Sequence, residues 1–397
     1  MIDIDNAEKI KLDDNVVYDI LDKICQHTHL IAITRIEFKL SDNLDSVATK
    51  TKILGGSSEK IQVGDDPQDT ILLTLVNNEL SIVTTKVVSY ECCEEQLFRR
   101  MPYMTSVDIK NVYFGNLVIA DYMFTSCMCL KEIDFSNADL SSVTSAEEMF
   151  RRCSELKVLN LDNIKPPTNL CNMNSMFADC KSIETIDLSN INTEHVATFK
   201  STFMNCYELK NLKWSPNTNK ACNLSHMFAN CKSMENIDLT GLHVDTEDGD
   251  NFTFSNMFYN CHKLKTVKLD TIKIKLCTSV LLDSMFENCE MLESVNIENL
   301  DLFRADTMLC MFAHCEHITN IDLSNISLRF TDKMSSMFYN CGELQHVKFN
   351  KESIKYRLQN VRREGLITTD HMFLGCEKLH NKDVSELKEI AAGCIFN

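Results

Sequence analysis

Cysteine is the residue type that could do the most chemistry in this chain, because a thiolate can attack an electrophile, bind a metal or form a disulfide. The sequence contains 19 cysteines, and ten of them stand three residues after the phenylalanine of a repeat. The ten are Cys127, Cys153, Cys180, Cys206, Cys231, Cys261, Cys289, Cys315, Cys341 and Cys376. A constant offset of this kind is typical of a structural repeat rather than of a reactive centre. We therefore expect these thiols to be buried, free and unreactive.

Two groups of cysteine and histidine have a spacing that a metal ion could use, but neither has the second pair of ligands that zinc sites show. The groups are Cys310, His314 and His317, and Cys25, His27 and His29. The acidic stretch 243–251 lacks the alternating order of a calcium loop. No phosphate-binding glycine loop and no recognisable serine, histidine and acid setting occurs. We expect no metal, no cofactor and no enzymatic activity.

The repeat that contains the cysteines is about 26 residues long, a period typical of solenoid proteins. Its clearest copies are MFADCKSIETIDLSN (176–190) and MFAHCEHITNIDLSN (311–325). In each copy, apolar residues recur first at helical spacing and then at the alternating spacing of a strand. In the copy at 334–350, this pattern predicts a short helix through Met337, Phe338 and Cys341, followed by a strand in which Val347 and Phe349 point inward.

The motif M-F-x-x-C-x-x-L-x-x-I-D-L-S-N resembles the BspA-like leucine-rich repeats, the 26-residue repeat family of bacterial surface proteins. The resemblance covers residues from about 94 to 380, and the motif is highly specific. It implies an α/β solenoid with one strand and one helix in each coil, used for adhesion or for protein binding.

Eleven coils can be counted, of which the first is atypical, as an end coil should be. Its Phe98, Met101, Met104, Val107 and Ile109 occupy the repeat positions, and Phe98 lies 26 residues before Phe124. We expect residues 93–380 to form the solenoid, 381–397 a capping helix, and 1–92 a small α+β domain. That domain should contain a helix over 14–26, a strand over 36–40 and a hairpin that turns at 77–78.

Solenoids usually bind with their concave face and with inserted loops, so both are predicted here to contact a protein partner. The face is predicted from the residue between the two inward strand positions of each coil: Asp134, Asn160, Asp187, Lys213, Asp238, Lys268, Asn296, Asp322 and Lys348. The 351–365 insertion is basic although the chain is acidic. Its basic residues are Lys351, Lys355, Arg357, Arg362 and Arg363.

The net charge of −17 and the pI near 5.1 disfavour nucleic acid as a partner. The N-terminus has neither a basic start nor an apolar core, so no signal peptide and no membrane insertion are expected. Neighbouring helices would keep the repeat cysteines roughly 8–10 Å apart, beyond the ~7 Å reach of a disulfide. Free thiols indicate a reducing compartment, which predicts an intracellular, cytoplasmic protein.

The resulting hypothesis is a non-enzymatic binding scaffold, for example a microbial or viral protein that acts on a host. Two alternatives remain open. The first is a cell-surface adhesin of the BspA-like type. The second is a ubiquitin-ligase adaptor, because residues 11–25 are similar to the first helix of an F-box, although Asp13 replaces the usual proline and the following stretch is predicted as a strand.

Overall fold

The chain forms two compact units in the computed structural model. Met1–Leu170 with Met176–Asn192 form the first unit, and Cys171–Ser175 with Thr193–Asn397 form the second. The structure describes residues 4–63, 66, 69–92, 96–99, 101–216, 221–240, 242, 244–245, 251–269, 273–275, 279–297, 301–302, 305–360, 367–380, 384–385, 387–389 and 391.

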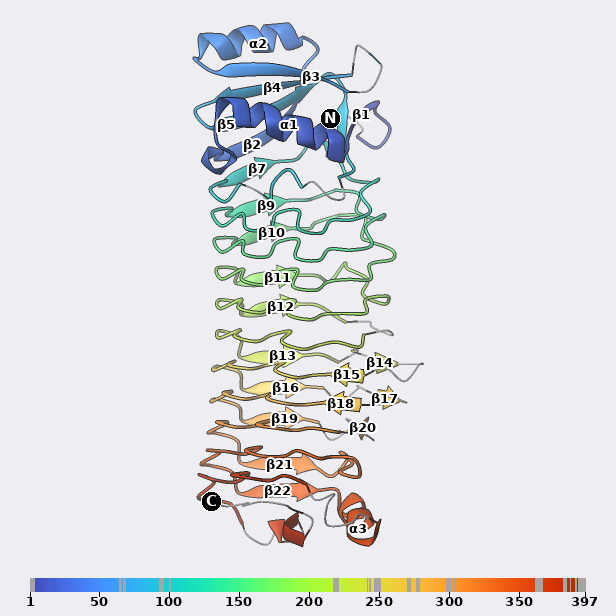
Figure 1. Cartoon of the computed structure of the whole chain (residues 1–397), viewed down its shortest axis with the longest axis vertical. Helices are drawn as coiled ribbons and strands as arrows, with labels where there is room; N and C mark the ends of the chain where they lie inside the picture. The colour runs from blue at the N-terminus through green and yellow to red at the C-terminus, as the bar shows by residue number, and fades with distance from the viewer. Residues whose placement is uncertain are drawn as a thin grey trace. The chain divides into compact units, whose positions relative to one another are not determined.

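The first unit begins with a small α+β arrangement, as the sequence predicts (Figure 1). Its elements are β1 (Lys9–Leu12), α1 (Asp14–His27), the 3₁₀ turn η1 (Leu30–Ala32), β2 (Arg35–Leu40), α2 (Leu44–Ile53), β3 (Ser57–Gln62), β4 (Thr70–Val76), β5 (Glu79–Thr84), β6 (Val87–Tyr90), β7 (Ser106–Asp108) and β8 (Val112–Tyr113). The strands form a five-stranded sheet in the order β3-β4-β5-β2-β7 and a three-stranded sheet in the order β1-β6-β8.

Local chemistry explains where these elements begin and turn. The Asp13 carboxylate accepts a hydrogen bond from the Val16 amide (3.2 Å) and so caps the first turn of α1. Asn77 (φ 50°) and Asn78 (φ 66°) join β4 to β5 in the left-handed region, which a two-residue hairpin turn needs and which asparagine tolerates. The predicted helix, strand and hairpin are therefore confirmed.

The strand of the first coil belongs to the N-terminal sheet. β7 pairs in parallel with β2, with Ile36 opposite Val107. The ring of Phe98 stacks on that of Phe124 at 4.7 Å and 11° between planes. The atypical first coil is thus present as predicted, and the N-terminal sheet covers the strand edge that this end of the coils would otherwise leave open.

Each later coil contributes one short strand, and neighbouring strands pair in parallel into short sheets, called the ladder below. In the first unit these strands are β9 (Glu132–Asp134), β10 (Val158–Asn160) and β11 (Thr185–Asp187). In the second unit they are β12 (Asn211–Lys213), β13 (Asn236–Asp238), β16 (Thr266–Lys268), β19 (Ser294–Asn296), β21 (Asn320–Leu323) and β22 (His346–Phe349). Coil pairs such as β9–β10, β13–β16–β19 and β21–β22 are in register, so equivalent repeat residues lie side by side.

The second unit has further short elements away from this ladder. They are β14 (Val244–Asp245), β15 (Asn251–Thr253), β17 (Lys273–Lys275), β18 (Ser279–Leu281), β20 (Asp301–Leu302), α3 (Lys351–Asn360) and the 3₁₀ turn η3 (Leu387–Glu389). β14, β17 and β20 form one parallel row, and β15 pairs with β18.

The predicted helix in each coil is wrong: the described Met-Phe segments are successions of tight turns. The residue before Met and the second residue after Phe have positive φ in all ten copies, for example Asn256 and Asn260 around Met257-Phe258 (both φ 60°). A right-handed helix cannot contain such residues. The freed amides instead bond to the next coil, as when Phe258 N–H donates to the Met285 carbonyl (2.9 Å).

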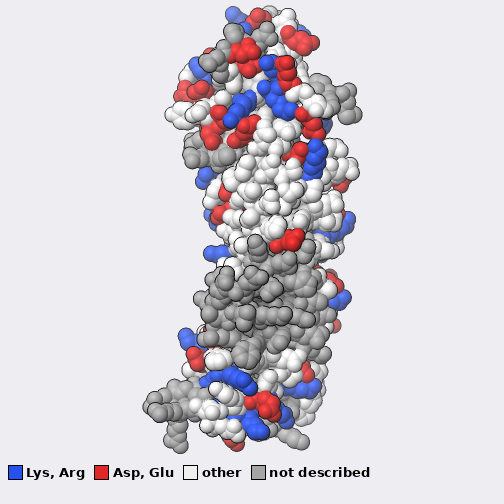
Figure 2. All heavy atoms as spheres, turned by 90° about the vertical axis from the view of Figure 1, so that its right-hand side faces the viewer, with Lys and Arg blue, Asp and Glu red and all other residues white. Residues whose placement is uncertain are grey.

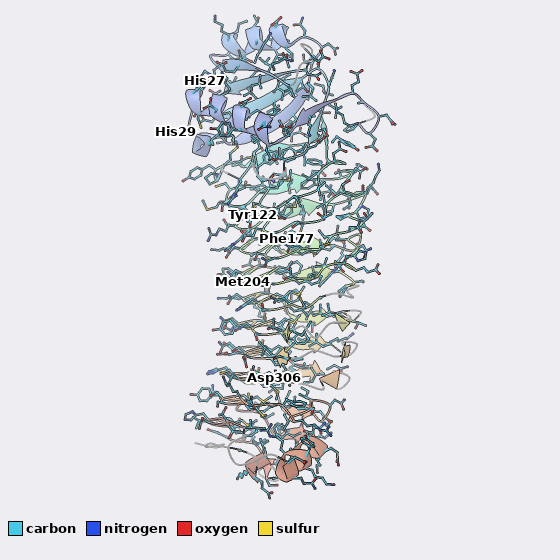
Figure 3. The ribbon with its side chains drawn as sticks, turned by 45° about the vertical axis from the view of Figure 1, so that its right-hand side comes forward. His27, His29, Tyr122, Phe177, Met204 and Asp306 are labelled. Carbon is cyan, nitrogen blue, oxygen red and sulfur yellow. The ribbon has the colours of Figure 1, made fainter. Side chains whose placement is uncertain are left out.

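Stacked phenylalanine rings form the centre of the core in both units. In the first unit the stack consists of Phe98, Phe124, Phe150 and Phe177, the last labelled in Figure 3. In the second unit, rings from Phe203 to Phe373 stack at 5.2–5.5 Å between centroids and 2–9° between planes. These rings are almost completely buried, so the inward assignment of the repeat phenylalanines is confirmed.

The repeat cysteines do more than fill space. Repeat thiols donate to the backbone carbonyl of the phenylalanine in the preceding coil, at 2.9–3.2 Å, as Cys261 does to Phe228. All the cysteines among the described residues are free. The predicted reason for the absence of disulfides, a helix spacing of roughly 8–10 Å, was wrong. Ring centroids of neighbouring coils lie 5.2–5.5 Å apart, so the coils are closer than packed helices. The carbonyl bond occupies each thiol instead.

Candidate partner-binding surfaces

The predicted stripe residues lie at the middle or end of the coil strands, and most are exposed. Several also have a structural task. The side chain of Asp134 accepts a hydrogen bond from the Ser136 amide (2.9 Å), and that of Asn160 accepts one from the Asp162 amide (2.9 Å). Such bonds close the turn that follows a strand, which explains the Asp-x-Ser of the repeat without any partner.

In the second unit, stripe acids are also neutralised by stripe lysines. Asp238 pairs with Lys268 of the next strand (3.0 Å), and Asp322 pairs with Lys348 (2.8 Å). Hydrogen bonds from the Thr240 hydroxyl and amide, followed by the one from Lys268, lower the pKa of Asp238 to about 2. The acidic and basic side chains of these two pairs therefore neutralise one another. Lys213 and Asn296 are exposed there as well.

Each unit has a hollow beside the stripe. The one in the second unit, of about 610 Å³, is lined by Lys348 and Lys351 among others, and the one in the first unit, of about 480 Å³, lies across β7, β9 and β10. Asp134 and Asn160 line it, and they face each other in the strand register. Asp134 therefore has a neutral neighbour where Asp238 has a lysine, and it forms no ion pair with another described residue. Val158, 53% exposed, lines the same hollow. Asp187, the third stripe residue of this unit, is exposed and lies outside the hollow's lining.

Charged side chains complete the wall of the hollow. They are Arg35, Asp108, Lys110 and Glu132. The sequence pattern missed this site, because the hollow forms where the N-terminal sheet meets the first coils. Val158 was the available signal: it is an apolar residue at a position where other copies of the repeat have Thr185, Asn211 or Asn236.

The basic insertion is a helix over its described part, α3, and not a loop. Lys351 and Lys355 are exposed at its surface. Arg357 is only 4% exposed, and its guanidinium donates to the carbonyls of Leu328 and Arg329, both at 3.1 Å. Burial lowers the pKa of this guanidinium. Arg357 therefore attaches α3 to the coils and is not part of a partner-facing surface.

Arg362 and Arg363 lie outside the described residues, as do residues 246–250 of the acidic insertion. The two cysteine and histidine groups are not gathered into metal sites: no three His, Cys, Asp or Glu side chains of the described residues could hold an ion together. His27, near the end of α1 in Figure 3, instead lies 3.1 Å from Glu59. Within the described chain, no helix is long and apolar enough to cross a bilayer.

An asparagine ladder in the second unit is a further feature that the sequence analysis missed. The Asn230 side chain donates to Asn205 (2.7 Å), Asn260 to Asn230 (2.9 Å) and Asn288 to Asn260 (2.7 Å). All four residues have left-handed φ values of 60–63°. Their signal is visible in the sequence as the Asn immediately before the repeat cysteine.

The repeat is matched by a known family model, which covers residues 118–242 and 252–387 and is described as "Mycoplasma protein of unknown function, DUF285". The chain belongs to the DUF285 family. No curated protein matches this DUF285 chain.

Two solved structures are similar to it at low identity. A leucine-rich cell surface protein from Faecalibacterium prausnitzii A2-165 is 14% identical, with 89% of this chain and 90% of that chain covered and a TM-score of 0.36. The Toll–Spatzle complex from Drosophila is 13% identical, with 89% of this chain and 51% of that chain covered and a TM-score of 0.25.

The predicted cytoplasmic location is corrected by these comparisons, since the first similar structure is that of a cell surface protein. The inference from the cysteines fails for a physical reason. Desolvation raises the pKa of a buried repeat thiol such as Cys261, to about 12, and this thiol donates its proton to the Phe228 carbonyl. Such thiols stay reduced by burial, so they do not report the redox state of a compartment.

Proposed function

We propose that this DUF285 protein is a non-enzymatic, adhesin-like repeat protein that binds a partner protein through the strand face of its first unit. The observation that supports this is the hollow across β7, β9 and β10, with Asp134 and Val158 in its wall. The finer relation to BspA-like repeats is part of the same proposal, supported by the ten copies of the motif.

The side chains of the hollow favour a partner that carries a basic side chain beside an apolar one. Asp134 offers a carboxylate without a lysine opposite it, and Val158 offers an apolar side chain 53% exposed beside it. A partner that inserts a lysine or arginine next to an apolar side chain satisfies both. An exposed ion pair contributes less than about 1 kcal/mol, whereas covering the valine contributes about 1 kcal/mol from apolar area. The apolar contact should therefore dominate affinity, and the charge should select the partner.

The F-box alternative is not favoured by the position of α1. Its apolar residues Val17, Ile20, Leu21 and Ile24 are at most 6% exposed, so they pack within the first unit. The chain after α1 continues into η1 and then β2, a strand of the five-stranded sheet. An adaptor subunit would have no apolar face of α1 to hold.

The test is capture of partner proteins from surface-biotinylated host cells with the full chain and three variants. Asp134→Asn keeps an acceptor for the Ser136 amide but removes the charge, and Asp238→Asn is the same change at the equivalent position in the second unit. Val158→Glu puts a charge in the hollow. We expect capture to fall with Asp134→Asn, to be lost with Val158→Glu, and to be unchanged with Asp238→Asn. Equal capture by all four proteins would refute the proposal.

A further inference from the structure

Cys376 is the repeat cysteine whose surroundings differ from those of the others. All ten repeat cysteines belong to the described residues, and nine of them are buried, whereas Cys376 is only partly buried. Its copy of the motif is the last of the ten in the sequence. The thiol of Cys376 still donates to the Phe338 carbonyl (2.9 Å), but this bond is partly exposed. Water can therefore take the proton of Cys376, whereas burial protects the protons of the other repeat thiols.

Cys341 lies beside Cys376, at the same repeat position in the preceding coil, and it is fully buried. The residues immediately before the two cysteines are in close contact, because the Cα of Asn340 is 3.1 Å from the position that a Cβ would have at Gly375. The side chain of Cys341 is in hydrogen-bond contact with that of Cys376. This contact, followed by the amide of Cys341, lowers the pKa of Cys376, although burial opposes the shift. Cys376 is therefore the member of the pair that ionises first.

The two coils that contain this pair are packed closely enough for a disulfide. The rings of Phe338 and Phe373 stack at 5.2 Å between centroids and 2° between planes. Two residues after each cysteine, Lys378 forms an ion pair with Glu343 (2.5 Å). Disulfides join residues whose Cα atoms are about 4.4–6.8 Å apart. Coils held in register at this spacing therefore place the two thiols within reach of one another.

We propose that Cys376 and Cys341 are a redox-active pair whose substrate is a small-molecule disulfide such as glutathione disulfide. The thiolate of Cys376 attacks one sulfur of this substrate, the substrate's S–S bond breaks, and the first small thiolate leaves. The sulfur of Cys341 then attacks the sulfur of Cys376, a bond forms between the two cysteines, and the second small thiolate leaves. The departing thiolates take up the two protons that the cysteines lose, so the substrate is reduced to two thiols and the pair is oxidised to one disulfide.

The charges at this end of the second unit do not repel an anionic substrate of this kind. Lys378 is exposed two residues after Cys376. The end of the chain that contains α3 has basic side chains, blue in Figure 2, beside acidic ones in red. The oxidised pair links the last coil covalently to the coil before it. This chemistry goes beyond the proposed function and does not depend on it, because it uses no residue of the first unit.

Incubation of the full chain with an excess of glutathione disulfide, followed by peptide mapping under non-reducing conditions, tests the proposal. We expect the peptides of Cys376 and Cys341 to be joined, and dithiothreitol to separate them. The exposed Cys25 should carry glutathione, which shows that the reagent is active. Cys289 and Cys315 are the matched control, because they occupy the same positions in adjacent coils with ring centroids 5.3 Å apart, but both are buried. They should stay reduced in the native protein.

Two variants separate the steps of the reaction. In Cys341→Ser, Cys376 should keep glutathione as a mixed disulfide, because no second thiol displaces it. In Cys376→Ser, Cys341 should stay unmodified, because the substrate cannot reach it. The result for the wild-type chain holds even if either variant fails to fold. A wild-type Cys376 that stays reduced, that keeps glutathione or that links to another cysteine would overturn the proposal, and so would a Cys289–Cys315 link formed equally fast.

Discussion

Asn260 is the residue at which conformation and hydrogen bonding can be separated most cleanly. It has φ 60°, donates to Asn230 at 2.9 Å and accepts from Asn288 at 2.7 Å. Asn260→Ala removes two side-chain hydrogen bonds, about 1 kcal/mol each, and replaces asparagine, which tolerates the left-handed region, by alanine, which does not, for about 1 kcal/mol more. We expect a total loss of about 3 kcal/mol. Asn260→Gly removes the same two bonds but tolerates the conformation, so we expect a loss of about 2 kcal/mol.

Urea unfolding followed by circular dichroism measures these differences, if the slope of the transition is the same in every variant. Asn320→Ala is the control, because the side chain of Asn320 is exposed on β21 and donates a hydrogen bond to its neighbour Thr319. It should change stability by less than about 0.5 kcal/mol. A glycine variant as stable as the wild type would show that the ladder contributes nothing. Equal losses for alanine and glycine would refute the conformational part of the reasoning.

Three further predictions concern the core, the thiols and pH. Phe228→Ala should lower the free energy of unfolding by about 3–5 kcal/mol, because it leaves a cavity between two stacked rings. Phe330→Ala, at a ring 41% exposed, should lower it by less than about 1 kcal/mol. Equal urea midpoints for the two variants would contradict a stabilising role of the ring stack. In native protein at pH 8, an aromatic disulfide reagent should label the exposed Cys25 but not the buried Cys261, whose pKa is raised to about 12, until urea is added; mass spectrometry of labelled peptides decides this. The lowered pKa of Asp238, about 2, contributes stability that is present above its usual pKa near 3.8 and is lost as pH falls toward 2. In Asp238→Asn, the urea midpoint should therefore depend less on pH between pH 4 and 2 than in the wild type. The difference in unfolding free energy should be less than about 1 kcal/mol, because the carboxylate is exposed.

Period and patterning were enough to predict the repeat, the inward residues and the strand of each coil. The strand register follows because the first inward strand residue stands nine residues after the repeat phenylalanine in each copy that has a strand, whatever the length of the copy, as at Ile237 opposite Val267. The helix was predicted wrongly because Met257, Phe258 and Cys261 also have helical spacing. The asparagine at 260 was the contrary signal, since asparagine tolerates the left-handed conformation that ends a helix.

The candidate site was predictable only in part. Asp134 and Asn160 follow from the strand pattern, but the hollow they line depends on the junction of β7 with β9, which no repeat encodes. Arg357 was predicted to face a partner because it belongs to a basic insertion in an acidic solenoid. Two backbone carbonyls hold it inside instead, and that long-range contact leaves no trace in local sequence.

Hydrogen exchange of the full chain, with and without its captured partner, tests the central claim most directly. The account predicts that binding slows exchange at 106–110, 132–134 and 158–160, the strands that line the hollow, and that 351–360 is unchanged. Protection confined to 351–360, or to strands of the second unit, would contradict binding through the first unit.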